Sequence, residues 1–188
     1  MIKRFLQIVL ILVSTSYFSV AQLGVRAGLN FSSMKFEVIG LNADTDSKVG
    51  VHFGLVNDLP LSDAITFRPG FLFSLKGGKS DEETISTSYI EVPLSFIYKF
   101  TKEDVGFFGE LGPYLGLLMS AKNESDGDIK EGFESLDYGL NFGLGYDLGT
   151  FIVGANYGLG LANIAKTGDG DDTTAKNANV SVYGIYQF

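Results

Sequence analysis

The feature that most constrains the fold is a two-residue alternation of apolar side chains with glycine or polar residues. The stretch LDYGLNFGLGYDL, residues 136–148, places tyrosine, leucine and phenylalanine on one face and mainly glycine, asparagine and aspartate on the other. A period of two is that of a β-strand whose two faces meet different surroundings. The alternation recurs in eight segments, which we expect to be strands: 23–32, 49–55, 65–74, 89–99, 107–119, 137–148, 151–161 and 180–188.

Glycine is unusually frequent on the second face of these segments, and the chain contains 24 glycines in all. A soluble barrel would carry charged and hydroxylic residues there, because that face would meet water. Glycine weakens a strand, so its frequent use there needs a reason. The narrow interior of a small closed barrel supplies one, because glycine makes room for larger side chains. The apolar face then points outward, which is tolerable only in lipid. The sequence predicts an eight-stranded antiparallel up-and-down transmembrane β-barrel, with a soluble periplasmic barrel as the alternative.

The connections between the expected strands also alternate in length. Short turns are expected at 60–63, 101–104 and 149–150, and long polar loops at 34–48, 77–87, 122–135 and 165–178. Short turns on one side and longer loops on the other are typical of outer-membrane barrels. Pro69, Pro93 and Pro113 lie inside expected strands and predict bulges or local breaks in pairing. Aromatic residues expected near strand ends, in an interfacial girdle, are Tyr98, Tyr138, Tyr146, Tyr157, Tyr186 and Phe188.

The first 21 residues have the pattern of a secretory signal peptide. Lys3 and Arg4 form a basic region, residues 5–13 are apolar, and Ser-Val-Ala at 19–21 is a small-residue cleavage site. An uncleaved spanning helix is disfavoured, because the apolar run is much shorter than the ~20 residues needed to cross a bilayer. We expect residues 1–21 to be the signal peptide, residues 22–188 the barrel domain, and the outer membrane the location.

Charge and cysteine content exclude several classes of function. Without Lys3 and Arg4, 12 of the 14 lysines and arginines remain against 22 acidic residues, so the mature chain carries −10. That charge excludes nucleic acid as a partner and argues against anionic lipid headgroups. The chain has no cysteine, which removes disulfides, thiol catalysis and cysteine-based metal sites.

Four motifs carry a resemblance to a known family: YIEVPLSFIYKF (89–100), GELGPYLGLL (109–118), LNFGLGYDLG (140–149) and the closing YGIYQF. The chain resembles the PorT-like single-domain outer-membrane barrels and, more loosely, the eight-stranded barrels typified by OmpX and OmpA. The resemblance implies a monomeric barrel in contact with outer-membrane lipid, with no cofactor. It also implies that the terminal Phe188 is an assembly signal read by the barrel-assembly machinery. No peptidoglycan-binding domain is expected after the last strand, which argues against a cell-wall anchor.

Alternation places several polar residues inside the barrel. The expected lumen network has Arg26, Arg68, Glu91 and Glu110 at its centre, with His52 and Asn141 beside them; further inward residues are Tyr89, Lys99, Tyr114, Asp137 and Asp147. The favoured interpretation is a structural plug of salt bridges and hydrogen bonds. The alternative is a path for ions or a site for a small polar ligand.

His52 is the only histidine, so a hydrolase that uses a serine, a histidine and an acidic residue would have one possible base. Some outer-membrane lipid A deacylases use such a group on the lipid-facing wall, and the inward position of His52 argues against that activity. We expect no enzyme, with a lipid-modifying enzyme as the least favoured hypothesis.

The long loops are acidic, in particular 122–137 and the sequence GDGDD at 168–172. Spaced carboxylates can hold Ca²⁺, but the spacing does not match an EF-hand, and solvated loops without a metal are the favoured interpretation. The expected function is a structural or surface-interaction barrel whose loops meet an unidentified extracellular partner. A narrow pore for ions or small solutes is the alternative.

Overall fold

The computed structural model describes residues 22–38, 41–80, 83–101, 105–123, 127–166 and 173–188. The expected signal peptide and the GDGDD sequence lie outside these residues. Among the described residues, no helix is long and apolar enough to span a membrane.

Eight long antiparallel strands form the barrel, and their neighbours in the sheet are also neighbours in the chain. The strands are β1 (Gln22–Val38), β3 (Asp46–Pro60), β4 (Ile65–Lys79), β5 (Thr84–Lys99), β6 (Gly106–Asn123), β8 (Leu136–Asp147), β9 (Phe151–Gly160) and β10 (Thr174–Gln187). Two short strands, β2 (Leu41–Asp44) and β7 (Gly127–Asp128), pair with the ends of β1 and β6. A 3₁₀ turn, η2 (Lys130–Gly132), follows β7.

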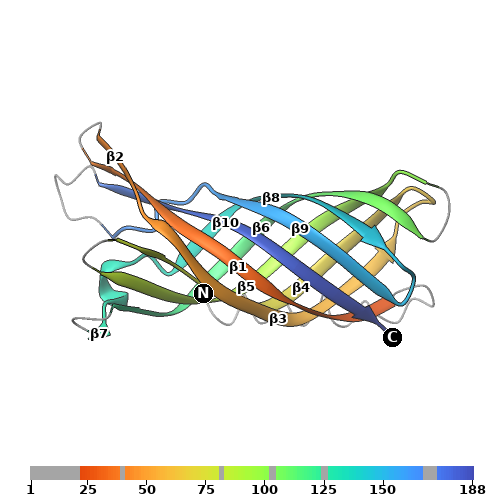
Figure 1. Ribbon diagram of the computed structural model, residues 1–188, viewed down its shortest axis with the longest axis horizontal. Coiled ribbons are helices and arrows are strands. Elements are labelled where there is room, and N and C mark those ends of the chain that lie inside the picture. The colour runs from red at the N-terminus through yellow and green to blue at the C-terminus, as the bar shows by residue number, and fades with distance from the viewer. Residues whose placement is uncertain (1–21, 39–40, 81–82, 102–104, 124–126, 167–172) are drawn as a thin grey trace.

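The barrel closes between its first and last strands. β1 pairs with β10 over a continuous register that runs from Gly24 opposite Gln187 to Glu37 opposite Thr174, and Phe188 N donates to Leu23 O at 2.9 Å. Closure gives every barrel strand two neighbours, so that the sheet has no open edge in lipid. In Figure 1 the C-terminus lies at one end of the barrel, and β2 and β7 lie at the other. We call these the short-turn end and the long-loop end. The predicted eight-stranded barrel is confirmed.

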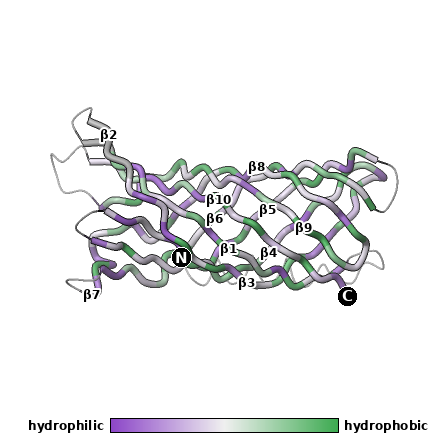
Figure 2. Tube along the Cα trace, viewed as in Figure 1, coloured by the Kyte–Doolittle hydropathy of each residue, from purple (hydrophilic) through white to green (hydrophobic). Residues whose placement is uncertain are grey.

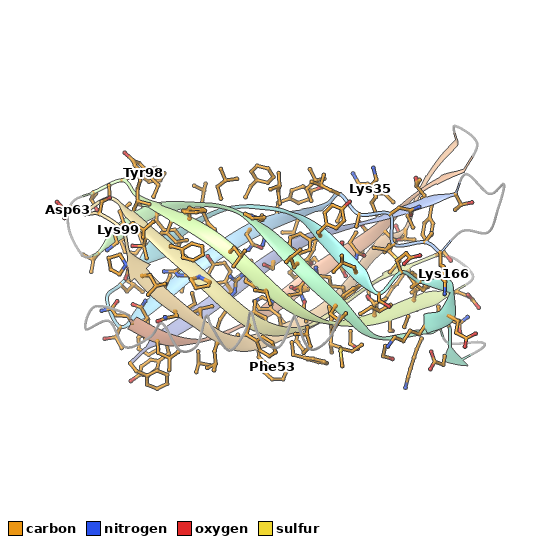
Figure 3. All side chains as sticks on the ribbon, turned by 180° about the vertical axis from the view of Figure 1, so that it is seen from behind. Lys35, Phe53, Asp63, Tyr98, Lys99 and Lys166 are labelled. Carbon is orange, nitrogen blue, oxygen red and sulfur yellow. The ribbon has the colours of Figure 1, made fainter. Side chains whose placement is uncertain are left out.

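The two faces of the wall have the predicted assignment. Residues of high and low hydropathy alternate along the strands (Figure 2), and Phe53 projects away from the wall in Figure 3. We call the outward apolar side chains the apolar belt; its exposed members include Leu23, Val25, Leu29, Phe31, Val51, Phe53, Leu55, Phe96, Leu111, Leu115, Phe142, Leu144, Val153, Val180 and Val182. An exposed apolar surface of this extent fits a lipid surrounding.

The predicted long loops are shorter than expected, because the strands continue into them. β1 extends to Val38 and β3 begins at Asp46, while β4 extends to Lys79 and β5 begins at Thr84. The sequence stretches 34–48 and 77–87 are therefore mostly strand. Backbone hydrogen bonds hold a hairpin together whatever its side chains, so pairing does not stop where the apolar alternation stops.

The prolines interrupt pairing without forming bulges. β4 and β5 pair from Ile65 to Pro69 and again from Leu72 to Lys79 in the same register, so the pairing breaks opposite Pro93. The β5–β6 pairing likewise skips Leu94 and Ser95, opposite Pro113 and Gly112, while Pro113 itself pairs with Leu140 of β8. The register shifts occur elsewhere, between Ser47 and His52 and between Ser88 and Tyr89.

The aromatic girdle is best formed at the short-turn end. Phe107 packs on Tyr146 with ring centroids 4.8 Å apart, and Tyr186 packs on both Phe151 and Phe188 at 5.0 and 5.2 Å. Tyr157 is an exception to the prediction: it pairs with Phe142 in the middle of β8, away from the strand end.

Candidate functional site

The lumen contains three ion pairs among the described residues, arranged in layers along the barrel. The short-turn layer is Arg68 with Asp58, the middle layer is Arg26 with Glu110, and the outer layer is Lys76 with Glu91. All six side chains are at most 12% exposed. Alternation turns each of them inward, and the length of each strand sets its depth in the barrel.

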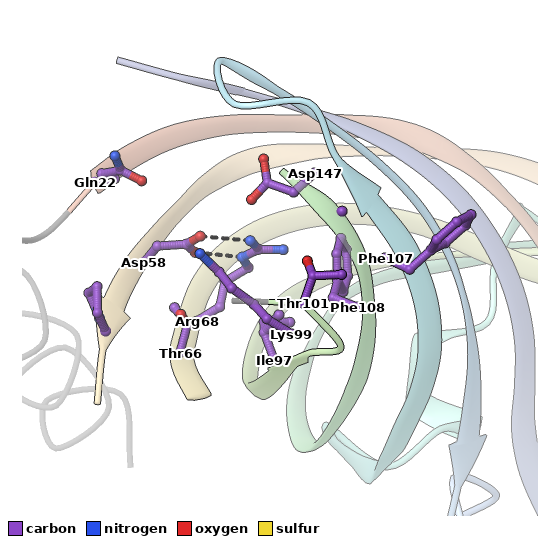
Figure 4. A pocket seen from close by; sticks show the side chains of 12 residues that line it. Gln22, Asp58, Thr66, Arg68, Ile97, Lys99, Thr101, Phe107, Phe108 and Asp147 are labelled. Atoms are coloured by element: carbon purple, nitrogen blue, oxygen red, sulfur yellow. Dashed lines mark hydrogen bonds and ion pairs between the residues drawn. The ribbon is translucent and has the colours of Figure 1, made fainter. Parts of the chain in front are cut away.

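The short-turn layer is a two-pronged arginine–carboxylate pair (Figure 4). Arg68 Nη2 donates to Asp58 Oδ2 at 2.6 Å, and Arg68 Nε donates to Oδ1. Gln187, the last residue of β10, also donates to Asp58 Oδ2, at 2.9 Å. The pair therefore links β3, β4 and the closing strand. Bidentate geometry makes this the most directional of the three pairs.

The middle layer joins four strands through one carboxylate. Glu110 accepts hydrogen bonds from Ser95 Oγ at 2.6 Å and Tyr183 Oη at 2.7 Å, and Arg26 Nη1 lies 3.9 Å from its Oε1. The Arg26 guanidinium stacks on the Tyr183 ring, 3.6 Å from the centroid. Such stacking adds cation–π attraction to the ion pair.

His52 belongs to the middle layer and uses both ring nitrogens. Arg26 Nε donates to His52 Nε2 at 3.2 Å, so Nε2 is an acceptor. Nδ1 then carries the proton and donates to Asn30 Oδ1 at 3.0 Å. Asn30 Oδ1 also accepts from Asn179 Nδ2 at 3.2 Å. The ring is a neutral connector between Arg26 and the asparagines.

The outer layer combines the Lys76–Glu91 pair with a buried aspartate. Asp137 accepts hydrogen bonds from Asn177 Nδ2 at 2.9 Å and Tyr114 Oη at 3.3 Å. Lys76 Nζ lies 4.9 Å from the centroid of the Tyr114 ring, which connects the two groups.

Apolar side chains separate and cover these layers. One cluster, near the short-turn end, includes Phe108 and Tyr183 and contacts both arginines, since Arg68 Cζ lies 5.6 Å from the Phe108 ring. At the long-loop end a second cluster packs Met34 against Ile164, and a third packs Tyr89 against Leu118. Phe133 contacts both outer clusters and so connects them.

The two cavities found among the described lumen residues are small. A central cavity of about 30 Å³ is bordered by the middle and outer layers, and a cavity of about 40 Å³ opens at the short-turn end beside Arg68. Each has room for a few waters at most, since one water needs roughly 10–15 Å³ of such volume. Each cavity is lined by a residue with a buried atom that lacks a protein partner, Asn179 Oδ1 in the centre and Arg68 Nη1 at the short-turn end.

The six residues predicted for the lumen network all lie inside the barrel, but they do not share one centre. Arg68, Arg26 and Glu91 belong to three different layers, and only Arg26 and Glu110 pair with each other. Asn141 lines the central cavity. The expectation of one charged centre is wrong, because a long narrow barrel spreads inward residues along its axis.

Asp58 and Lys76, the partners of Arg68 and Glu91, were missed. Both lie on the inward parity of their strands, at positions past the expected strand ends of 55 and 74. Continuing the alternation by a few residues would have found them. Lys99 and Asp147 line the cavity at the short-turn end.

No cluster of metal-ligating side chains occurs among the residues that the structure describes. The acidic positions 124, 126 and 168–172, on which the calcium alternative depends, lie outside them.

A family comparison identifies the chain. Residues 15–166 match the family model described as outer membrane protein beta-barrel domain. The chain belongs to this family. It is therefore a β-barrel of the outer membrane, and the location expected from the sequence is supported to that extent.

Two of the solved structures compared, NspA and PagL, share the fold of this chain. The Neisserial surface protein A (NspA) matches with a TM-score of 0.58 and 18% identity, over 89% of this chain and 99% of NspA. The outer membrane enzyme PagL matches with a TM-score of 0.50 and 13% identity, over 84% of this chain and 98% of PagL. Ail of Yersinia pestis gives a TM-score of 0.49 at 16% identity, over 89% and 99% of the two chains. The comparison with curated proteins finds no match. At these identities the likeness concerns fold alone.

Proposed function

We propose that this outer-membrane barrel is a non-conducting scaffold that holds hairpin extensions at the cell surface for interaction with an extracellular partner. The observation that carries the proposal is the filled lumen, with three ion-pair layers and apolar clusters over its long-loop end. When its own side chains fill the interior of a barrel, the surfaces left to contact a partner are those of its strands and loops.

Conduction would require several stable contacts to break together. An ion that enters from the short-turn end meets the Arg68–Asp58 pair, then the stacked Arg26 and Tyr183, and finally the Met34 and Leu118 clusters. Removing one partner from a buried ion pair costs about 3–5 kcal/mol. These barriers in series support the scaffold over the narrow pore.

The strand extensions supply the surface for interaction. The apolar face of β1 ends at Phe31, yet the strand continues to Val38, and β10 begins at Thr174, six residues before Val180. Seven residues at about 3.3 Å each extend the β1 wall beyond the belt by roughly 20 Å along the strand. Paired backbone keeps such extensions rigid, which reduces the entropy lost when a partner binds.

The environment of His52 supports a role without catalysis. Both ring nitrogens are engaged inside the lumen, and the residue is 3% exposed, so lipid on the outer wall has no access to it.

Two finer assignments belong to the same proposal. From the four motifs we infer that the chain is a PorT-like barrel within its family, and from the pattern of residues 1–21 that cleavage after Ala21 releases a mature monomer beginning at Gln22. The assembly machinery then reads Phe188.

Single-channel recording in planar bilayers tests the scaffold directly. The protein, refolded and purified, should give no current steps at 1 M KCl and 100 mV, while a known porin gives steps in the same chamber. The Glu110→Ala variant, which opens the middle layer, is the informative comparison. Regular conductance steps from the unaltered protein would refute the scaffold and favour the pore.

A further inference from the structure

Two lysines face each other on the outside of the barrel, just beyond the apolar belt. Lys35 on β1 is paired in register with Lys176 on β10, and both side chains are exposed. Four residues nearer the membrane, Phe31 is paired with Val180, and both belong to the belt. The lysines therefore share the outward face with the lipid-facing residues of the same strands. Lys35 is labelled on the long-loop side of the barrel in Figure 3.

The pairing of two cations is unfavourable without an anion. Side chains directly opposite in an antiparallel pair have Cβ atoms about 4.5–5.5 Å apart, and like charges there are destabilising. The register position on the other side of Lys35 is Asp44 of β2. An anion at the membrane side of the pair would relieve the repulsion between the two facing ammonium groups.

The depth of the pair matches the lipid headgroups. Four residues of strand at about 3.3 Å, tilted by about 45°, place the two Cα atoms roughly 9 Å above the Phe31–Val180 pair. The polar layer of a bilayer is about 5–7 Å thick on each side. Lysine side chains extend along an apolar surface and place the ammonium at the interface, so both ammonium groups reach this layer.

We propose that Lys35 and Lys176 together bind a phosphate group of a phosphorylated lipid headgroup in the outer leaflet. The site fixes one lipid at the β1–β10 closure, where the first and last strands of the chain meet. The net charge of −10 argued against anionic headgroups as partners. The local charge at the membrane boundary differs, because the acidic residues concentrate in the loops while this pair stands at the belt.

Native mass spectrometry with a defined lipid tests the site. The probe is diphosphoryl lipid A, and its dephosphorylated form measures binding that does not involve phosphate. Each lysine near a charged headgroup contributes about 1 kcal/mol, which is about a fivefold factor in affinity. The variant Lys35→Gln/Lys176→Gln should bind diphosphoryl lipid A about 20- to 30-fold more weakly and the dephosphorylated form unchanged.

The matched control is Lys79→Gln/Lys166→Gln, which removes the same charge from exposed lysines at the same end of the barrel. Lys79 is opposite Asp46 and Thr84 and does not face a lysine. The control should keep the affinity of the unaltered protein, and a heat-dependent gel shift will verify that both variants are folded. An equal loss in the control, an unchanged double variant, or full competition by millimolar inorganic phosphate would each overturn the lipid site.

Discussion

Several lumen glycines leave the space that a neighbouring ring occupies. A Cβ atom on Gly28 would lie 2.6 Å from His52 Cε1, and one on Gly154 would lie 2.5 Å from Tyr183 Cζ. The Tyr114 ring lies against Gly139 in the same way. The glycine face and the aromatic or imidazole rings of the lumen are thus two halves of one packing arrangement. The expected role of glycine as the residue that makes room is confirmed at these positions.

The change Gly154→Ala should lower the free energy of unfolding by about 1–3 kcal/mol, because overpacking forces Tyr183 away from Glu110. Urea titration of the barrel in lipid vesicles, followed by the heat-dependent gel shift, will measure it. Gly132→Ala is the control, since nothing lies within 4 Å of a Cβ there. Equal stability of the two variants would contradict the packing argument.

The carboxylate of Glu110 holds the middle layer together, so its removal leaves the charge of Arg26 in the lumen without its carboxylate partner. We expect Glu110→Ala to reduce the free energy of unfolding by about 3–5 kcal/mol. The exposed residue Glu134 provides the control, as Glu134→Ala should change stability by less than about 0.5 kcal/mol. A loss below 1 kcal/mol for Glu110→Ala would mean that the layer contributes little to the fold.

Asn179 Oδ1 is buried, has no hydrogen-bond donor among the described residues, and belongs to a residue that lines the central cavity. Polar cavities of this size hold water. We expect a crystal structure at about 2 Å resolution to show a water within hydrogen-bond distance of this oxygen. In Asn179→Leu that water should be absent, and an empty cavity in the unaltered protein would refute the assignment.

The strands are longer than the membrane requires. One strand can therefore face lipid along part of its length and extend beyond the membrane along the rest. The half of β1 up to Phe31 faces lipid, whereas the remainder of the strand is paired backbone beyond the belt. Apolar alternation marks only the first half, because side chains in water need not be apolar. The hydrogen-bond ladder continues through both.

The terminal residue Phe188, which follows β10, allows a test of how the barrel is assembled. Phe188 is 73% exposed, stacks edge-on with Tyr186, and donates its backbone N–H to Leu23. Deletion of Phe188 should reduce the amount of folded barrel in the outer membrane several-fold while synthesis stays unchanged, as measured by pulse labelling and the gel shift. Phe188→Tyr, which keeps an aromatic terminus, should assemble normally. Unimpaired assembly of the deletion would show that the terminal aromatic is not the signal.

The whole molecule is held by closure, since β1 and β10 lie at opposite ends of the chain and share a continuous register. Closure also fixes which inward residues meet across the lumen, as with Tyr183 and Glu110, which are 73 residues apart. Stability is therefore a property of the complete barrel. Partial barrels would expose both edges and an uncovered polar interior to lipid.

Processing and location can be tested on the full chain. Intact mass measurement of protein from the outer-membrane fraction should correspond to residues 22–188, and the unheated sample should migrate faster on a gel than the heated one. A mass that retains residues 1–21 would contradict the predicted cleavage. Recovery from the soluble periplasm would contradict the membrane barrel.

The sequence by itself determined the class of fold and the direction of each side chain. A period of two assigns Arg26 and Arg68 to one face and Val25 and Phe67 to the other without knowledge of any partner. The abundance of glycine on the first face then identifies it as the interior. These conclusions need only local pattern, which is why they agree with the structure.

The tertiary structure decided the partners and the depth of each group. Asp58 and Lys76 could be placed only once the true strand lengths were known, and Arg26 meets Glu110 because the curvature and register of a closed eight-stranded barrel bring β1 and β6 together across the lumen. Lys35 and Lys176 likewise lie opposite each other only because of the register in which β1 and β10 pair. Contacts between distant segments follow from barrel diameter and strand stagger, which no local period of residues contains.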